Sequence, residues 1–378
     1  MARILISAGE VSGDLHAAAV TAAIKKIDSS TEVFGMGGDA LRNAGGEVLF
    51  DIKDHGVMGF VEVIKKLPDL FKLRDDFEKI MDERKPDCLI TVDYPGFNMK
   101  LAKLAHEKGI PVVSYIAPSA WAWHKSRAKN VAKIVDRVAC IFPFEYDVYK
   151  EAGAKVEFVG HPLVDIVKPS MSIDEAKVFA GKKEGRPLIL LMPGSRLMEI
   201  EKMLPTILEA AKLIRKQLPE VDFVMPRAGS IPVEMLEEKI KASGLNVKIT
   251  EGNNYDLFSV ADLALATSGT VTLEAALCGL GSVIVYRTNP LTYMIAKMVV
   301  NIPHIGLPNI VAARSVLPEL IQNDFTAANV AKEAISLLEP KRNARMKKDL
   351  EYVKERLGKP GAVGRVAELV LEIAGEKR

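Results

Sequence analysis

Cysteine is scarce in this sequence of 378 residues: Cys88, Cys140 and Cys278 stand far apart, each in an apolar run. An odd number of distant cysteines argues against a disulfide framework and favours a reducing compartment. Charge is nearly balanced as well, with 51 Lys and Arg against 49 Asp and Glu, a net charge of +2. The chain therefore has no global attraction for nucleic acid, although a local basic patch could meet a phosphate or an anionic bilayer.

Several patterns are missing altogether. No apolar run reaches the roughly eighteen residues that a membrane span needs. The start of the chain has a short apolar run that enters a glycine turn, and this pattern is typical of a buried strand and not of a signal peptide. No Asp-x-Asp triplet, Walker motif or metal-ligand spacing occurs. We therefore expect no metal site, no carboxylate clamp for a metal–nucleotide complex and no ATP-type phosphoryl transfer.

Short apolar runs alternate with amphipathic stretches along the whole chain. The runs that we predict to be strands are residues 4–8, 32–36, 88–92, 112–116, 138–142, 156–159, 188–192, 222–225, 247–250, 263–267 and 282–286. Continuous apolar strands with helices between them indicate parallel sheets covered on both faces. We predict an α/β fold of two doubly wound, Rossmann-like domains, residues 1–167 and 168–345, facing across a cleft. A lysine-rich helical tail, 346–378, would close one domain or cross back to the first.

Ligands of open parallel sheets bind beyond the carboxyl ends of the strands, so the residues just after each strand matter most. The first strand is followed by Gly9, Glu10, Ser12 and Asp14. The glycine lets backbone approach a ligand closely, while Ser12 or Asp14 as a helix N-cap explains the same segment equally well.

The strand at 88–92 leads into Asp93, and Asn98 follows before the next predicted helix. An aspartate at the mouth of a cleft can act as a general base on an alcohol. Asn98 suits the helix N-cap better than Asp93 does, so we favour a chemical role for Asp93. Beyond another strand stand both tryptophans of the chain, Trp121 and Trp123, which suit contact with a sugar or acyl group or else pack in the core.

The second half has two polar turns at strand ends. Gly194, Ser195 and Arg196 follow one strand. The guanidinium lies near a helix start, where the helix dipole disfavours a cation, which favours a phosphate ligand over the alternative of an ordinary surface arginine. The other turn consists of Ser268, Gly269 and Thr270, whose hydroxyl and N–H groups could bind a diphosphate. Glu274 follows about one helical turn later, and its carboxylate could accept hydrogen bonds from a ribose. Ser268 as an N-cap is the plain alternative, and Asn309 lies in a later loop that could touch a base or phosphate.

Residues 57–74 combine apolar side chains with lysines, and residues 290–301 are similarly apolar. A basic amphipathic stretch can lie on a bilayer or hold an acyl chain, whereas a helix packed on a sheet gives the same pattern. The candidate lipid contacts in the first stretch are Val61, Val63, Ile64, Leu67, Leu70 and Phe71.

Taken together, the segments at 9–14, 57–62, 93–98, 118–123, 143–145, 160–161, 193–196, 268–270 and 307–309 resemble the lipid-A-disaccharide synthase family. They occur in the family's order and span most of the chain. The resemblance implies a GT-B glycosyltransferase that joins UDP-2,3-diacylglucosamine to 2,3-diacylglucosamine 1-phosphate, releasing UDP and a β-1′,6-linked disaccharide. It also implies inversion at the anomeric carbon, no metal or other cofactor, and a place at the cytoplasmic face of the inner membrane of Gram-negative bacteria. A homodimer is left open.

The resemblance assigns Asp93 as the base for the acceptor 6-hydroxyl and Arg196 as the cation that stabilises the departing diphosphate. The residues that would hold UDP are Gly194, Ser195, Arg196, Ser268, Gly269, Thr270, Glu274 and Asn309. The residues that would shape the acceptor side are Gly9, Glu10, Ser12, Trp121 and Trp123.

Two positions depart from the pattern. Some relatives carry an acid where this chain has Gly96, so Asp93 is the lone carboxylate of its motif, and His124 stands where a larger cation is expected in some members. A UDP-N-acetylglucosamine 2-epimerase of the same fold and a non-catalytic sugar-nucleotide binding protein are the alternative functions. The first needs no lipid-facing segments, and the second would not depend on Asp93.

Overall fold

The structure is a computed structural model of the whole chain, and it describes residues 1–55, 67–118, 125–299 and 303–376. The chain forms two compact units. Unit 1 consists of Met1–Pro162 and Gly358–Arg378, and unit 2 of Leu163–Leu357. Within the described ranges, no helix combines the length and the apolar character that crossing a bilayer requires.

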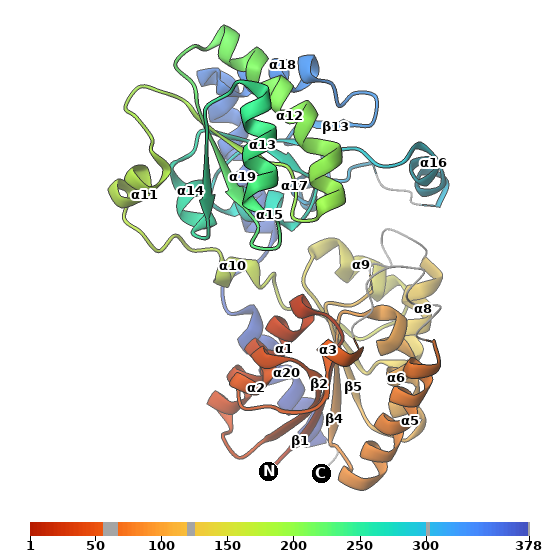
Figure 1. Cartoon of the computed structure of the whole chain (residues 1–378). Helices are drawn as coiled ribbons and strands as arrows, with labels where there is room; N and C mark the ends of the chain where they lie inside the picture. Colours follow the sequence, from red (N-terminus) through yellow and green to blue (C-terminus); the bar gives the residue numbers. More distant parts are fainter. Residues whose placement is uncertain (56–66, 119–124, 300–302, 377–378) are drawn as a thin grey trace. The chain divides into compact units, whose positions relative to one another are not determined.

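Unit 1 is built on a seven-stranded parallel sheet of order β3-β2-β1-β4-β5-β6-β7 (Figure 1). Its strands are β1 (Arg3–Ala8), β2 (Glu32–Gly37), β3 (Glu47–Asp51), β4 (Cys88–Val92), β5 (Val112–Tyr115), β6 (Arg137–Cys140) and β7 (Val156–Phe158). Its helices are α1 (Val11–Ile27), α2 (Asp39–Asn43), α3 (Ile52–His55), α5 (Leu67–Arg84), α6 (Pro95–Glu107), α8 (Lys125–Ile134), α9 (Pro143–Glu151) and α20 (Ala362–Glu376).

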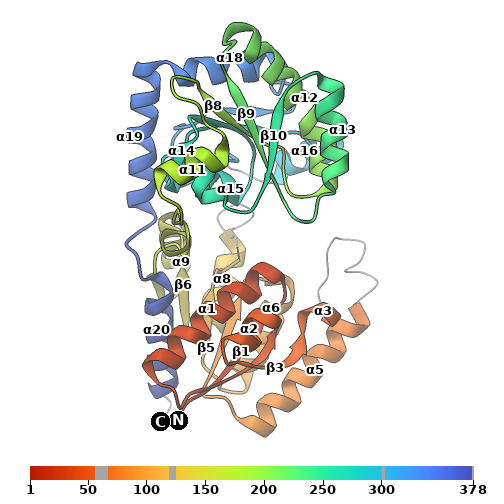
Figure 2. The ribbon, with the colours of Figure 1, turned by 60° about the vertical axis from the view of Figure 1, so that its left-hand side comes forward.

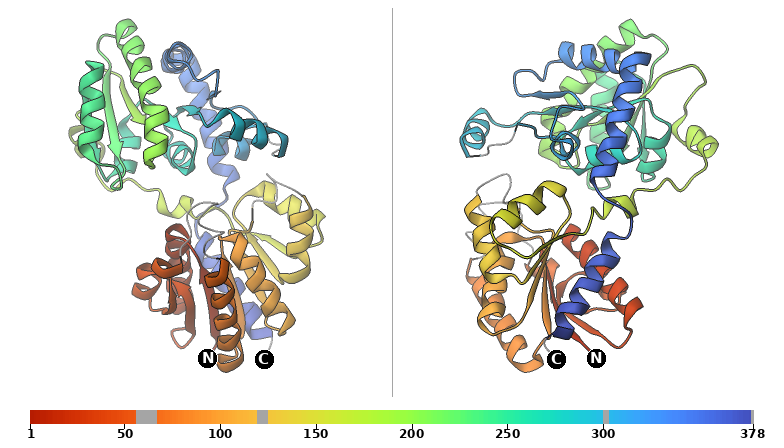
Figure 3. Two further views of the ribbon diagram at one scale, coloured as in Figure 1. Left: turned by 45° about the vertical axis from the view of Figure 1, so that its right-hand side comes forward. Right: turned by 180° about the vertical axis from the view of Figure 1, so that it is seen from behind.

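Helices cover both faces of this sheet, which is why its central strands are apolar on both sides. Leu5 of β1 belongs to the core cluster that α5 and α6 complete with residues such as Phe77 and Leu101. On the other face α1 and α20 pack against each other and against β4 (Figure 3). All five residues of β4 are buried, as expected for a strand inside a covered parallel sheet.

Unit 2 repeats the plan with a six-stranded parallel sheet of order β10-β9-β8-β11-β12-β13 (Figure 2). Its strands are β8 (Leu188–Met192), β9 (Asp222–Arg227), β10 (Val247–Glu251), β11 (Leu263–Thr267), β12 (Ser282–Tyr286) and β13 (Glu319–Ile321). Its helices are α10 (Leu163–Ile166), α11 (Ile173–Ala180), α12 (Leu197–Gln217), α13 (Val233–Ser243), α14 (Asn254–Val260), α15 (Thr270–Leu277), α16 (Pro290–Val299), α17 (Leu307–Ala312), α18 (Ala327–Leu338) and α19 (Pro340–Arg356).

The parallel sheets and the alternation of strand and helix confirm the expected fold class. The ends of the units differ from the expected domain bounds. The first division follows Pro162 instead of residue 167, and the expected boundary at 345/346 falls inside the continuous helix α19. Of the expected tail, the part from Gly358 onward belongs to unit 1, where the buried face of α20, which includes Val366 and Val370, packs on α1.

Candidate active site

Asp93 lies immediately after β4, at the carboxyl edge of the unit 1 sheet, in an unusual backbone conformation. Its φ is +49° and that of Tyr94 is +50°, the left-handed region that non-glycine residues seldom enter. The Asp93 N–H donates to the carbonyl oxygen of Tyr115 at 3.2 Å. Burial raises the pKa of the Asp93 carboxyl, and the N–H of Tyr94, which bonds to it, offsets part of the rise in pKa. A half-buried carboxyl on a strained turn has the properties of a general base.

Asn98 holds this turn in place from within α6. Its side-chain amide donates to the carbonyl oxygens of Ser7, Val92 and Asp93 at 3.1, 3.2 and 2.7 Å. In return its oxygen accepts the Ser7 hydroxyl at 2.7 Å. The prediction that Asn98 is a helix N-cap is wrong, because α6 begins at Pro95 with Tyr94 as N-cap. The fully buried amide instead ties the ends of β1 and β4 together.

The turn after β1 lies against the turn after β4. A Cβ atom on Gly9 would come within 2.1 Å of the Tyr94 ring, so only glycine allows this packing. Burial, and after it the charge of Glu10, raises the pKa of Tyr94. Gly9 and Glu10 therefore lie beside the Asp93 turn.

The N-cap predictions for Ser12 and Asp14 are wrong. Helix α1 begins at Val11 with Glu10 as N-cap, which places both residues inside its first turn. Ser12 is exposed there, next to the turn. The Asp14 carboxylate is buried and accepts hydrogen bonds from the N–H groups of Gly38, Ala40 and Leu41 at 2.7, 3.0 and 3.1 Å.

The candidate lipid contacts are only partly described. Val61, Val63, Ile64, Trp121 and Trp123 lie outside the described residues, as do His124 and the side chain of Leu67. On α5, Leu70 packs against the core, whereas Phe71 is 49% exposed. The Lys100 ammonium and the Arg74 guanidinium lie 5.2 and 5.8 Å from the centre of the Phe71 ring. Together with Gly96 these side chains line a small cavity, so α5 borders the helix turn that follows Asp93.

Unit 2 has a cavity of about 360 Å³ at the carboxyl edge of its sheet. It lies between the turns that follow β8, β9 and β11. Its lining residues are Met192, Gly194, Ser195, Arg196, Glu199, Pro226, Arg227, Ala228, Asn254, Thr267, Ser268, Gly269, Thr270 and Val271. The structure therefore brings six of the sequence-predicted UDP residues to one cavity: Gly194, Ser195, Arg196, Ser268, Gly269 and Thr270.

Glu199 organises the turn after β8, and sequence reasoning missed it. One of its carboxylate oxygens accepts the Ser195 N–H at 3.1 Å, and the other lies 3.2 Å from the Arg196 guanidinium. A Cβ on Gly194, whose φ is +122°, would come within 2.6 Å of the same carboxylate. Arg196 is the N-cap residue of α12, and its side chain is 80% exposed. An acid three residues into a helix is a known N-terminal signal, so the spacing from Arg196 to Glu199 could have revealed it.

The turn after β11 offers backbone donors to the same cavity. Helix α15 begins at Thr270 with Gly269 as N-cap, so the prediction of Ser268 as N-cap is wrong. The Ser268 hydroxyl donates instead to the Ile305 carbonyl oxygen at 3.0 Å. Gly269 and Thr270 are exposed, which leaves the start of α15 open to a ligand. The starts of α12 and α15 therefore point two sets of N–H groups at one cavity, a suitable arrangement for a diphosphate.

Glu274 and Asn309 are not among the residues that line the cavity. Burial raises the pKa of Glu274, and a hydrogen bond from the Tyr255 hydroxyl offsets part of that rise in pKa. Asn309 is fully buried, donates to Leu317 and Glu319, and accepts the N–H groups of Val316 and Leu317. Its amide is committed to the loop before β13, so the structure does not present it to a ligand.

Comparison with solved structures identifies the fold class of the two units. UDP-GlcNAc 2-epimerase from Neisseria meningitidis, bound to UDP-GlcNAc, matches with a TM-score of 0.68 and 14% identity over 98% of this chain and 100% of that chain. MurG from Acinetobacter baumannii matches with a TM-score of 0.62 and 17% identity over 98% and 100%. The fold is thus the GT-B type, with two parallel-sheet α/β units.

The sequence narrows the class to one family. The family described as lipid-A-disaccharide synthetase matches residues 4–372. The lipid-A-disaccharide synthase of Geobacter sulfurreducens is 42% identical over 376 residues, 99% of this chain and 98% of that protein. That of Myxococcus xanthus is 37% identical over 372 residues, 98% and 97%. The chain belongs to the lipid-A-disaccharide synthetase family and is a glycosyltransferase of lipid A biosynthesis.

Proposed function

We propose that this glycosyltransferase joins UDP-2,3-diacylglucosamine to 2,3-diacylglucosamine 1-phosphate, with Asp93 as the base and Arg196 as the phosphate cation. The observation that carries the proposal is the half-buried Asp93 carboxyl with its raised pKa, held on a strained turn at the carboxyl edge of a parallel sheet. Family membership supplies the reaction. An epimerase is less well supported, since the epimerase likeness at 14% identity concerns the fold alone.

In the proposed reaction, the Asp93 carboxylate removes the proton of the acceptor 6-hydroxyl as its oxygen attacks the anomeric carbon of the donor sugar. The new carbon–oxygen bond forms on the face opposite the diphosphate, and the bond from the anomeric carbon to the diphosphate oxygen breaks. The electron pair leaves with UDP, and the configuration inverts. Burial favours this role, because a base whose pKa is raised towards the working pH accepts a proton more readily.

The leaving diphosphate would be met by the cavity in unit 2. Backbone N–H groups at Gly269 and Thr270 and the exposed Arg196 guanidinium can bond to its oxygens. Stabilising charge that develops on a leaving group is among the largest contributions a protein makes to catalysis. Glu274 would exchange the Tyr255 hydroxyl for ribose hydroxyls. Asn309 would act indirectly, by holding the loop before β13.

We also propose that the protein associates with the cytoplasmic face of the inner membrane through α5 and the segment before it. Phe71 is half-exposed with Arg74 and Lys100 close to its ring, which combines an apolar anchor with cations for anionic headgroups. Leu70 supports the helix from the core side. This arrangement would bring acylated substrates near Gly96 and the Asp93 turn.

The decisive experiment is incubation with the two glycolipids and mass detection of the disaccharide. Asp93→Asn should abolish transfer while the dissociation constant for UDP stays near that of the wild type, because Asp93 and the UDP cavity belong to different units. Arg196→Ala should weaken UDP binding and lower the transfer rate. Asp174→Asn, at a side chain that is 95% exposed, serves as the matched control and should change neither.

Each alternative function gives a different result. UDP release from the donor without any acceptor would indicate an epimerase-like reaction. UDP binding without product, unaffected by Asp93→Asn, would indicate a binding protein. Residual transfer by Asp93→Asn together with lost UDP affinity would contradict the assigned roles.

A further inference from the structure

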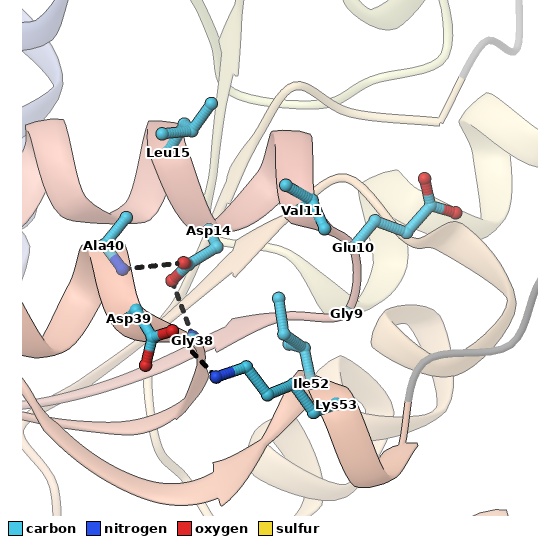
Figure 4. A pocket seen from close by; sticks show the side chains of 10 residues that line it. All are labelled: Gly9, Glu10, Val11, Asp14, Leu15, Gly38, Asp39, Ala40, Ile52 and Lys53. Carbon is cyan, nitrogen blue, oxygen red and sulfur yellow. Dashed lines mark hydrogen bonds and ion pairs between the residues drawn. The ribbon is translucent and has the colours of Figure 1, made fainter. Parts of the chain in front are cut away.

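Unit 1 contains a cavity of about 460 Å³ whose lining includes two of the acceptor-side candidates, Gly9 and Glu10, and to which no part of a ligand has been assigned. It lies at the carboxyl ends of β1 and β2, between the start of α1, the turn into α2, and α3 (Figure 4). Its size is within the range of about 300–1,000 Å³ that is usual for small-molecule sites. The cavity belongs entirely to unit 1, so its shape is defined by that unit alone.

The polar groups around this cavity already have partners. The Asp14 carboxylate takes the N–H groups of Gly38, Ala40 and Leu41, and it is only 4% exposed. The Lys53 ammonium donates to Asp39 at 2.7 Å, as Figure 4 shows. A sugar or phosphate in the cavity would have to break these bonds to gain its own. Because these polar groups already form hydrogen bonds within the protein, the cavity disfavours a polar ligand.

Apart from Glu10, the remaining walls are apolar. Val11 and Leu15 project from the first turns of α1 and are 64% and 61% exposed, although both are large aliphatic side chains. Ile52 of α3 and Ala40 of α2 line the cavity with them. A ligand that covers these side chains gains free energy in proportion to the apolar area removed from water. Hydrocarbon is the ligand chemistry that fits.

The cavity is also next to the candidate base. Gly9 lines it, and the Gly9 backbone packs on the Tyr94 ring, one residue from Asp93. We propose that the cavity receives an acyl chain of the acceptor glycolipid while the acceptor 6-hydroxyl lies at Asp93. This inference rests on the proposed function and adds to it a site for one chain. The acceptor is favoured over the donor because the cavity shares Gly9 with the packing of the turn that carries Asp93, and this base acts on the acceptor.

The test measures how kcat/KM depends on acceptor chain length. The probes are 2,3-diacylglucosamine 1-phosphates whose chains are shortened in two-carbon steps, used with one fixed donor. For the wild type, each buried methylene should contribute up to about fourfold to kcat/KM. The double variant Val11→Gln, Leu15→Gln should flatten this dependence and lower kcat/KM for long-chain acceptors about tenfold or more. Its kcat/KM for the shortest acceptor should stay within about twofold of the wild type.

A second variant and a control distinguish a specific effect on the cavity from general misfolding. Ala40→Leu narrows the cavity without adding a polar group and should shift the preference towards shorter acceptor chains. Val178→Gln changes an aliphatic side chain that is 80% exposed in unit 2, and should leave the chain-length dependence unaltered. Circular dichroism and the melting temperature confirm that each variant is folded.

The outcomes separate this inference from the proposed function. An unchanged acceptor dependence in both cavity variants, with disaccharide still formed, would overturn the inference and leave the function standing. A changed dependence on donor chain length, with that on the acceptor unchanged, would also overturn it. Absence of disaccharide with every acceptor, in the wild type, would overturn the function itself.

Discussion

Glu199→Gln should tighten UDP binding, although it removes a side chain from the cavity that we assign to UDP. The Glu199 carboxylate lies 3.2 Å from the Arg196 guanidinium, so it competes with the diphosphate for that cation and adds a like charge beside it. Glutamine keeps an oxygen that can accept the Ser195 N–H but removes the charge. The variant therefore tests the effect of the Glu199 charge while it preserves the hydrogen bond to the Ser195 N–H.

The size of the effect follows from the exposure of the pair. The Arg196 side chain is 80% exposed and that of Glu199 24%, and exposed ion pairs contribute roughly 0.2–1 kcal/mol. We expect the dissociation constant for UDP to fall about two- to fivefold at low ionic strength. The gain should shrink as salt is added, because screening weakens charge interactions at exposed sites.

Glu199→Gln should make the folded protein less stable, although it tightens UDP binding. An acid in the first turn of a helix interacts favourably with the helix dipole, worth about 0.3–1 kcal/mol. Glu199→Gln should therefore lower the melting temperature slightly while it raises UDP affinity. Calorimetric titration with UDP at two salt concentrations measures the affinity. Glu201→Gln, an exposed acid on the same helix, is the control. Weaker UDP binding by Glu199→Gln, or equal tightening by Glu201→Gln, would refute the reasoning.

Four further expectations concern the base, the metal and the membrane. The raised pKa of Asp93 means that the folded state holds its proton more tightly than the unfolded state, so this carboxyl costs stability above its unfolded pKa. Asp93→Asn should therefore raise the melting temperature at neutral pH, and this effect should vanish as the pH falls below the unfolded pKa of the carboxyl, where both states are protonated; a lower melting temperature at neutral pH would contradict this. In a plot of kcat/KM against pH, the fall in activity on the acid side should occur at a pH above the ordinary pKa range of aspartate, because transfer stops when Asp93 is protonated. A kcat/KM that does not change with pH through this range would argue for another base. EDTA should leave transfer unchanged if amides and Arg196 neutralise the diphosphate; loss of activity that Mg²⁺ restores would show otherwise. Phe71→Glu should reduce co-sedimentation with anionic vesicles, whereas Ile173→Glu, at a side chain that is 52% exposed in unit 2, should not; full binding by Phe71→Glu would remove α5 from the membrane contact.

The sequence predicted the strands with continuous apolar runs and missed the marginal ones. β4, β8 and β11 are buried along their whole length, so hydrophobicity alone identifies them. β3 is an edge strand whose residues are exposed or half-buried, and β13 has only three residues, all half-buried. Neither carries a pattern that distinguishes it from a loop. Their pairing partners in the sheet, and not their own residues, decide that they are strands.

Helix starts were the weaker part of the site prediction. Local rules favoured Ser12, Asn98 and Ser268 as N-caps, but Glu10, Tyr94 and Gly269 occupy those positions. In the two best-defined cases the polar side chain makes a distant bond instead: Asn98 bonds to Ser7, and Ser268 to Ile305. Such partners are remote in sequence, so a pattern along the chain does not reveal them. The turns themselves were found, because polar residues after buried strands mark the carboxyl edge of a parallel sheet.

The backbone strain at that edge supports the choice of Asp93 over the other carboxylates. Asp93 and Tyr94 after β4, and Ile116 after β5, all have positive φ, and each left-handed non-glycine residue costs about 1–2 kcal/mol. Such strain persists only where surrounding contacts enforce it, and here Asn98 and Gly9 do so, one through hydrogen bonds and the other through its missing Cβ. A turn that served only to connect β4 to α6 would gain stability from an ordinary conformation. The strain is therefore best explained by the position that it gives to the Asp93 carboxyl.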